Sequence, residues 1–178
     1  RFVTPTYPGD YERTRTLRSS LERFNPDDEH LLVVADADLP SARRAFGTDA
    51  AILAHSEVLP GRSPELHRLP APARRRLKLG WWLQQLAKLN VGRALALDSW
   101  ICLDSDTFLV DTIRPADCYA PDGRPFLLEL LDHPVGGHVE RFNRRAARIL
   151  DLPADAASVA RVYTAMCVPI SAVVCDQL

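Results

Sequence analysis

The sequence predicts a single α/β domain in which a mostly parallel central sheet is flanked by helices. Short apolar segments with strand character alternate along the chain with longer segments whose apolar residues recur at helical spacing. One of the short segments, His30–Ala35 (HLLVVA), is apolar throughout, which is typical of a parallel strand covered on both faces. A chain of 178 residues is long enough for one domain with its own core.

Five elements are predicted in the first third of the chain. Strands are expected at Phe2–Thr6, His30–Ala35 and Ala50–Ala54, because each is a short apolar run next to turn-forming or polar residues. Helices are expected at Tyr11–Phe24, where apolar residues stand at i, i+4 and i+7, and at the shorter segment Leu39–Phe46. This alternation is the order that a parallel sheet requires.

The pattern continues after a connection rich in proline, HSEVLPGRSPELHRLPAP, which is predicted to be long and irregular. A helix is expected at Ala73–Val91, with Gly92 ending it. Further strands are expected at Trp100–Leu103 and Pro125–Leu131, and a helix at Val139–Leu150.

The helix predicted at Ala73–Val91 has two notable faces. An apolar stripe contains Trp82, which we expect in the core. Another face carries Trp81, Gln85 and Lys88 at i, i+4 and i+7. On that face Lys88 is expected to reach a phosphate or to tether a carboxylate.

Composition argues against two kinds of partner. Twenty-two basic and 23 acidic residues give a formal charge of -1, which offers no overall field for gripping nucleic acid. The longest apolar stretch, AMCVPISAVV, contains Pro169 and is shorter than the roughly 20 residues of a transmembrane helix. The sequence opens without a recognisable secretion signal, so the cytoplasm is the expected compartment.

Two carboxylates close the apolar strand in the stretch ICLDSDTFLV. If the chain stays extended, Asp104 and Asp106 project to one side and Ser105 to the other. Unpaired buried carboxylates are costly, which favours a cation or a basic partner at this strand end. Mg²⁺ and Mn²⁺ suit such oxygen ligands and take further ligands from substrate phosphates. In a doubly wound sheet, this strand end would share a crevice with the first-strand turn and Asp36.

Other interpretations of this stretch remain open. An Asp-Ser-Asp sequence also forms capped turns. A phosphatase of the haloacid-dehalogenase type has an apolar strand followed by Asp-x-Asp, with Asp104 as nucleophile and Asp106 as acid and base, although Phe108 departs from that pattern. A non-catalytic domain that binds nucleotide or a protein partner is a third possibility. A calcium loop is excluded, because Leu109 stands where its glycine is required.

The stretches GWWLQQLAKL (80–89) and ALDSWICLDSDTFLV (96–110), with the opening FVTPTYPGDYERTRTLRSSL, resemble nucleotide-sugar-dependent glycosyltransferases of the GT-A fold. More narrowly, the chain is similar to a family of uncharacterised bacterial glycosyltransferase-like proteins, of which it would cover the N-terminal two-thirds. The resemblance implies one GT-A-like, Rossmann-like domain over residues 1–178. Because the chain stops in apolar sequence, we expect this domain to be truncated at its C-terminus.

The implied activity is transfer of a sugar from a nucleoside diphosphate, of UDP or GDP type, to a glycan, lipid or small-molecule acceptor. In GT-A enzymes the Asp-x-Asp holds a divalent metal on the donor diphosphate, which maps to Asp104 and Asp106 and implies Mn²⁺ or Mg²⁺. The residues expected to bind the nucleotide sugar are Thr4, Pro5, Thr6, Tyr7, Asp36 and Asp104, together with Gln85 and Lys88 of the upstream helix. A general base is needed if configuration inverts, and Glu129 and His138 are candidates.

Overall fold

The computed structural model describes residues 1–59, 79–126, 129–130, 148, 162–163 and 167–172. The chain divides into two compact units, Arg1–Phe126 with Met166–Leu178, and Leu127–Ala165. In the second unit, strands β5 (Glu129–Leu130) and β6 (Val162–Tyr163) pair antiparallel. The elements described below belong to the first unit. One domain over residues 1–178 stays a prediction.

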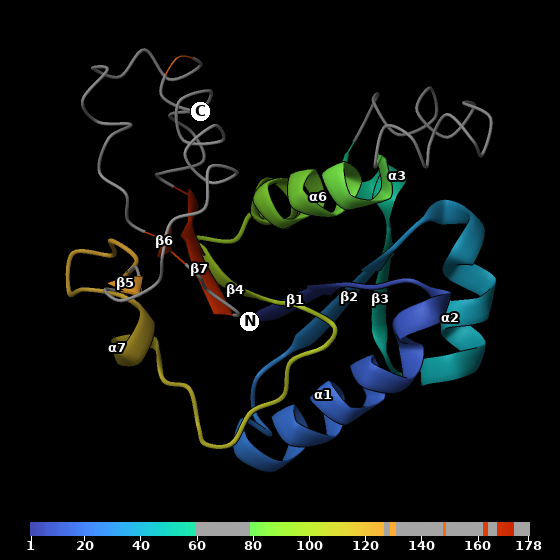
Figure 1. The fold of residues 1–178 in the computed structure, drawn as a ribbon, viewed down its shortest axis with the longest axis horizontal. Coiled ribbons are helices and arrows are strands. Elements are labelled where there is room, and N and C mark those ends of the chain that lie inside the picture. The colour runs from blue at the N-terminus through green and yellow to red at the C-terminus, as the bar shows by residue number, and fades with distance from the viewer. Residues whose placement is uncertain (60–78, 127–128, 131–147, 149–161, 164–166, 173–178) are drawn as a thin grey trace. The chain divides into compact units, whose positions relative to one another are not determined.

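A five-stranded sheet with the strand order β3-β2-β1-β4-β7 forms the centre of the first unit (Figure 1). Its strands are β1 (Phe2–Pro5), β2 (His30–Val34), β3 (Ala51–Ala54), β4 (Ser99–Leu103) and β7 (Cys167–Ser171). The first four run parallel, whereas β7 pairs antiparallel with β4. The prediction of an α/β protein with a mostly parallel sheet is therefore confirmed.

Helices lie on both faces of this sheet (Figure 1). The helices α1 (Tyr11–Phe24) and α2 (Leu39–Phe46) cover one face, and α6 (Leu79–Leu95) covers the other. Shorter helical segments are η1 (Pro8–Asp10), η2 (Asp36–Asp38), α3 (His55–Val58) and α7 (Pro115–Cys118). In the described ranges no helix combines the length and the apolar content that a bilayer crossing demands.

The strands bury side chains toward both helical layers, because successive residues of a strand point to opposite faces. On one face, Val3 of β1 packs in a buried cluster with Val91 of α6. On the other, Phe2 packs with Leu17 and Leu21 of α1. Continuous apolar strands such as β2 are thus explained by a core on each side of the sheet.

Gly92 does not end α6, contrary to the prediction. The helix continues to Leu95, and Ala96 then adopts a left-handed conformation with φ of 50°. Gly92 instead permits close packing, because a Cβ at this position would lie 1.9 Å from Cζ3 of the buried Trp100 ring. The same indole donates from Nε1 to the carbonyl oxygen of Lys88 at 2.8 Å. Helix α6 and strand β4 are therefore fixed against each other along this stretch.

The prediction that Trp82 lies in the core is wrong. Its side chain is 48% exposed, and its ring meets Trp81 edge-on with centroids 4.8 Å apart. The face of α6 that is buried carries Leu83, Ala87, Lys88, Val91 and Gly92. Apolar residues occur all round this helix, so their periodicity did not single out the face that packs on the sheet.

Two other predicted segments differ from the structure. The helix α3 forms where an irregular connection was expected to begin, and the Glu57 carboxylate accepts from the Ala54 amide at 2.6 Å at its start. Within the strand predicted at Pro125–Leu131, Pro125 makes an isolated bridge and only β5 is a described strand. Residues 73–78 of the predicted helix, and nearly all of the helix predicted at Val139–Leu150, lie outside the described residues.

Candidate functional site

The candidate site lies at the carboxyl edge of the sheet, between β1 and β4. Strand β1 pairs with β2 on one side and with β4 on the other, so the strand order reverses between β1 and β4. Ligands of open α/β sheets bind at such a switch point, outside the carboxyl ends of the strands. The chain segments that leave this point are residues 6–10 after β1 and residues 104–107 after β4.

The two aspartates after β4 lie on a turn. The amide and the hydroxyl of Thr107 both donate to the carbonyl oxygen of Asp104, at 3.1 and 2.7 Å. The extended geometry assumed for this stretch is therefore wrong beyond Leu103. Exposure nevertheless alternates, because Asp104 and Asp106 are exposed while Ser105 is buried.

Lys88 of α6 holds the first of these carboxylates. Its Nζ lies 2.5 Å from Oδ1 of Asp104, and the lysine side chain is only 11% exposed whereas that of Asp104 is 52% exposed. The backbone of Lys88 is fixed as well, because its carbonyl oxygen accepts from the Trp100 indole. Tethering of a carboxylate, one of the two roles predicted for Lys88, is thus present. Helix α6 thus places the largely buried ammonium of Lys88 at the end of β4.

Asp10 is a site residue that the sequence analysis missed. It ends the loop after β1, is 8% exposed, and accepts from the Ser105 hydroxyl at 2.8 Å. Its other carboxylate oxygen accepts from Arg13 at 3.3 Å. In the sequence, an aspartate directly before a helix looks like an ordinary N-cap. Its contact with Ser105 joins residues far apart in the chain and leaves no local signal.

The four residues predicted from the first-strand loop are placed differently from one another. Thr4 is fully buried, and its hydroxyl lies 2.9 Å from Nε2 of His30. Pro5 is buried at the end of β1, and the buried Thr6 hydroxyl is 2.7 Å from that of Thr14. Tyr7 is the member of this group with an exposed side chain. Contact with a ligand through a side chain therefore remains open to Tyr7, whereas Thr4 has no exposed surface to offer.

Three of the other predicted residues come from three different elements, and the fourth lies outside the described residues. Asp36 is exposed in η2, where its carboxylate accepts from the Ser56 amide at 3.3 Å. Gln85 is partly buried on α6, one turn before Lys88. Glu129 belongs to β5 in the second unit, and His138 lies outside the described residues. The candidate bases thus cannot be related to the switch point.

The donor atoms near the turn fit a hard divalent cation. Hydrogen bonds among the described residues engage Oδ1 of Asp104 but neither its second oxygen nor the carboxylate of Asp106. Mg²⁺ and Mn²⁺ commonly use one or two carboxylates and complete their shell with water and substrate phosphate. No group of three or more acidic, histidine or cysteine side chains forms a cage within the described ranges. The residues present therefore suit a cation shared with a phosphate ligand.

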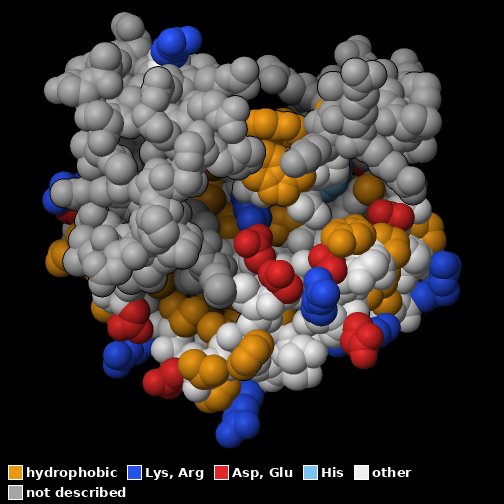
Figure 2. Space-filling model, in the orientation of Figure 1, with side chains coloured by type: hydrophobic (Ala, Val, Ile, Leu, Met, Phe, Trp, Pro, Cys, Tyr) orange, Lys and Arg blue, Asp and Glu red, His pale blue; other side chains and the backbone are white. Residues whose placement is uncertain are grey.

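Carboxylates outnumber cations around this turn. Of the three carboxylates Asp10, Asp104 and Asp106, the described salt bridges pair Asp10 with Arg13 and Asp104 with Lys88, and leave Asp106 without a cation. Acidic side chains also gather near the centre of the face drawn in Figure 2, with basic side chains between them. An excess of negative charge repels a diphosphate, and a bound divalent cation would reverse the sign.

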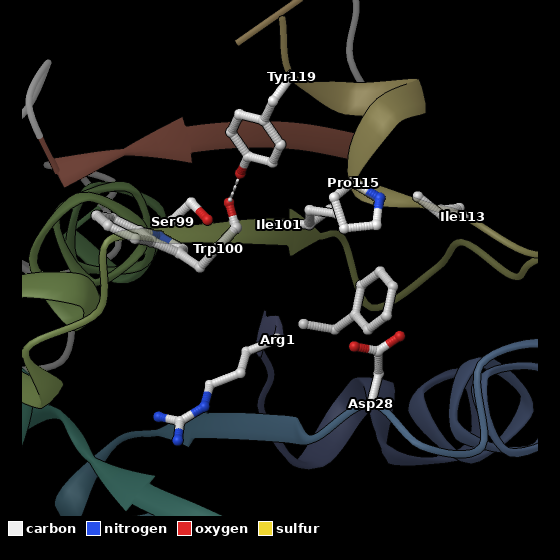
Figure 3. Close-up of a pocket in the computed structure, with 9 residues that line it drawn as sticks. Arg1, Asp28, Ser99, Trp100, Ile101, Ile113, Pro115 and Tyr119 are labelled. Carbon is white, nitrogen blue, oxygen red and sulfur yellow. Dashed lines mark hydrogen bonds between the residues drawn. The ribbon is translucent and has the colours of Figure 1, made fainter. Parts of the chain in front are cut away.

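A small cavity lies at the opposite edge, where β1 and β4 begin (Figure 3). Its volume is about 60 Å³, whereas ligand pockets usually enclose about 300–1,000 Å³. Tyr119 borders it and donates to the carbonyl oxygen of Trp100 at 2.8 Å. Burial raises the pKa of Tyr119 to about 12, so the phenol keeps its proton. This cavity has room for water and none for a nucleotide.

Residues 3–169 of the chain match a family model described as "Family of unknown function (DUF6492)". The match includes both segments of the switch point and the whole of α6. No curated protein matches the chain. The family description names no activity, so the function has to be inferred from the residues and their geometry.

Proposed function

This chain belongs to the DUF6492 family, and we propose that it is a metal-dependent glycosyltransferase that moves a sugar from a nucleoside diphosphate to an acceptor hydroxyl. One observation carries the proposal: at the switch point between β1 and β4, the buried Lys88 pairs with Asp104, and the exposed Asp106 follows on the same turn. This is the position at which α/β sheets bind nucleotides. The resemblance of the same residues to the GT-A Asp-x-Asp supports the assignment.

The chemistry of sugar transfer explains this combination of charges. The acceptor oxygen bonds to the anomeric carbon, the bond from that carbon to the diphosphate breaks, and the diphosphate leaves with both electrons. A divalent ion, when bound, neutralises charge on the leaving diphosphate. Asp106 and the second oxygen of Asp104 would hold that ion, while Lys88 fixes Asp104 and keeps a positive charge beside the leaving group.

The remaining proton must leave the acceptor hydroxyl. In an inverting reaction a general base takes it as the new bond forms. Glu129 and His138 stay candidates for this role. The donor half of the site can be tested independently of this base.

A thermal-shift titration tests the donor half. UDP, GDP, CDP and dTDP would each be added with Mn²⁺, Mg²⁺ or EDTA. One nucleotide should stabilise the protein only with metal, by about 2.7 kcal/mol at a concentration 100 times its dissociation constant. Asp106→Asn should lose this effect. Asp27→Asn, which alters an exposed acid in the loop before β2, should keep it.

Two results would count against the proposal. Absence of any metal-dependent shift with all four nucleotides would remove the donor site. Release of inorganic phosphate from a phosphomonoester, lost in Asp104→Asn, would favour the phosphatase interpretation of the same aspartates. Release of the nucleoside diphosphate from its sugar in the presence of Mn²⁺ would instead support the transferase.

A further inference from the structure

Asp10 occupies the N-cap position of α1 without acting as a cap. Its side chain accepts no capping hydrogen bond from the backbone amides of the first turn, although Oδ1 accepts from the Arg13 side chain. The carboxylate points instead toward β4, where it accepts from Ser105, and its carbonyl oxygen accepts from the Thr14 hydroxyl at 3.0 Å. N-cap aspartates usually bond the second or third amide of the helix. The Asp10 carboxylate instead accepts from Ser105, on the other side of the switch point.

Ser105 is the central residue of the Asp104–Asp106 turn and is the part of it that is buried. It is 9% exposed, and its hydroxyl donates to Oδ2 of Asp10 at 2.8 Å. A hydrogen bond to a charged, mostly buried acceptor is among the stronger ones in proteins. It holds Ser105 inward, and the two flanking carboxylates consequently face solvent.

The turn is therefore anchored at two successive residues from the two sides of the sheet. Lys88 comes from α6, which covers one face, and holds Asp104. Asp10 comes from the loop that leads into α1 on the other face, and holds Ser105. Among the described residues, Asp106 is the one polar side chain of the turn without a protein partner. Its carboxylate is the one left for a ligand.

We propose that Asp10 is a positioning residue that acts through Ser105 to hold Asp104 and Asp106 in the geometry that binds a metal-bound nucleoside diphosphate. The inference rests on the proposed function and adds to it a residue outside the Asp-x-Asp. Loss of the clamp formed by Asp10 and Ser105 frees the turn to rotate, which weakens the ligand without removing either carboxylate. Residues that orient metal ligands typically change metal affinity about 10- to 100-fold when lost.

The test measures affinity separately from stability. Binding of Mn²⁺ would be followed by electron paramagnetic resonance in the presence of the nucleotide selected by thermal shift, well below the unfolding temperature of every variant. Asp10→Ala and Ser105→Ala should each weaken binding about 10-fold or more. The double variant should be no weaker than the singles, because both remove one interaction. Asp10→Asn keeps an oxygen for Ser105 and should retain most of the affinity.

Asn25→Ala is the matched control. Asn25 is also buried and also joins distant segments, since it donates to the Ile113 carbonyl oxygen at 2.8 Å, but it lies at the far end of α1. This variant should be destabilised and bind Mn²⁺ with unchanged affinity. Ser105→Ala removes a single oxygen, so it carries the test if Asp10→Ala does not fold.

The outcomes separate the clamp from the proposed function. Lower melting temperature with wild-type affinity in both clamp variants would show a purely structural role and overturn the inference, while loss of binding in Asp106→Asn would leave the transferase site in place. If the wild-type protein binds no Mn²⁺ with any of the nucleotides, the proposed function fails and the inference fails with it.

Discussion

Acid should destabilise this protein through His30. The imidazole lies at the start of β2, with Nε2 close to the Thr4 hydroxyl. Its Nδ1 is buried and has no hydrogen-bond partner among the residues that the structure describes. Burial, assisted by the Arg18 cation, lowers the pKa of His30 from 6.5 to about 3. Between these values the unfolded chain binds a proton that the folded chain does not. Stability should therefore fall as the pH drops from 6.5 toward 3, and this contribution should level off below.

The size of the effect follows from the same two values. Each pH unit in this window costs about 1.4 kcal/mol, so about 2.7 kcal/mol is lost two units below the ordinary pKa. That is a large share of a typical free energy of unfolding, about 5–15 kcal/mol. The perturbation to make is His30→Gln, which removes the titration and keeps a side chain that can bond Thr4.

Urea unfolding at a series of pH values measures this loss of stability. Between neutral pH and about pH 4.5, the wild-type protein should lose about 2.7 kcal/mol more than His30→Gln, since the other titratable groups are the same in both proteins. Thr4→Val is the control, because it removes the hydrogen bond and leaves the imidazole. Its acid dependence should match that of the wild type. Equal pH slopes for the wild type and His30→Gln would refute the argument.

Four further substitutions test the contacts around β4. Gly92→Ala should destabilise the protein by about 1–3 kcal/mol, measured by urea unfolding, because its Cβ would overlap the Trp100 ring; an unchanged midpoint would contradict the close packing. Asp104→Ala should lower the free energy of unfolding by about 1–2 kcal/mol, because it leaves the buried Lys88 ammonium without its carboxylate. Lys88→Met should lower it by less, because it removes the buried charge as well. A larger loss of stability in Lys88→Met than in Asp104→Ala, measured by calorimetry, would contradict this account of the ion pair. Tyr119→Phe should lower stability by about 1 kcal/mol, because the hydroxyl bonds the carbonyl oxygens of Trp100 and Ile170. A melting temperature equal to that of the wild type would show that water replaces the hydroxyl as the donor to these carbonyl oxygens.

The first helices were predictable because their signals are local. Tyr11–Phe24 and Leu39–Phe46 have the predicted bounds, since amphipathic spacing defines each helix and Asn25-Pro26 and Gly47 follow them. The strands of the parallel sheet were recognisable for a similar reason. Apolar runs covered on both faces carry their signature in composition alone.

What could not be predicted depends on residues that are distant in the chain. Gly92 reads as a helix end, and only the position of the Trp100 ring shows that it serves packing. Strand β7 was not predicted, because Pro169 weakens the pattern of a strand. It is tolerated in the last strand of the described sheet, where one side needs no amide donor.

The candidate site was predicted in part for the same reason. The positions of Asp104 and Asp106 after a buried strand, and the reach of Lys88, follow from strand and helix geometry. Asp10 was not predicted as a site residue, because an aspartate at this position can cap the helix or bond a distant residue. Its bond to Ser105 is visible only in the folded sheet. Assignment of the metal, the nucleotide and the sugar stays a prediction.

The pairing of β7 with β4 bears on how the protein is made. The chain leaves the first unit after Phe126 and returns to it at Met166, having built the second unit in between. During synthesis the apolar edge of β4 therefore stays unpaired until Cys167–Ser171 has emerged from the ribosome. Open strand edges pair readily with other chains. The interval in which the second unit is synthesised is thus a period in which the nascent protein is exposed to aggregation through this edge.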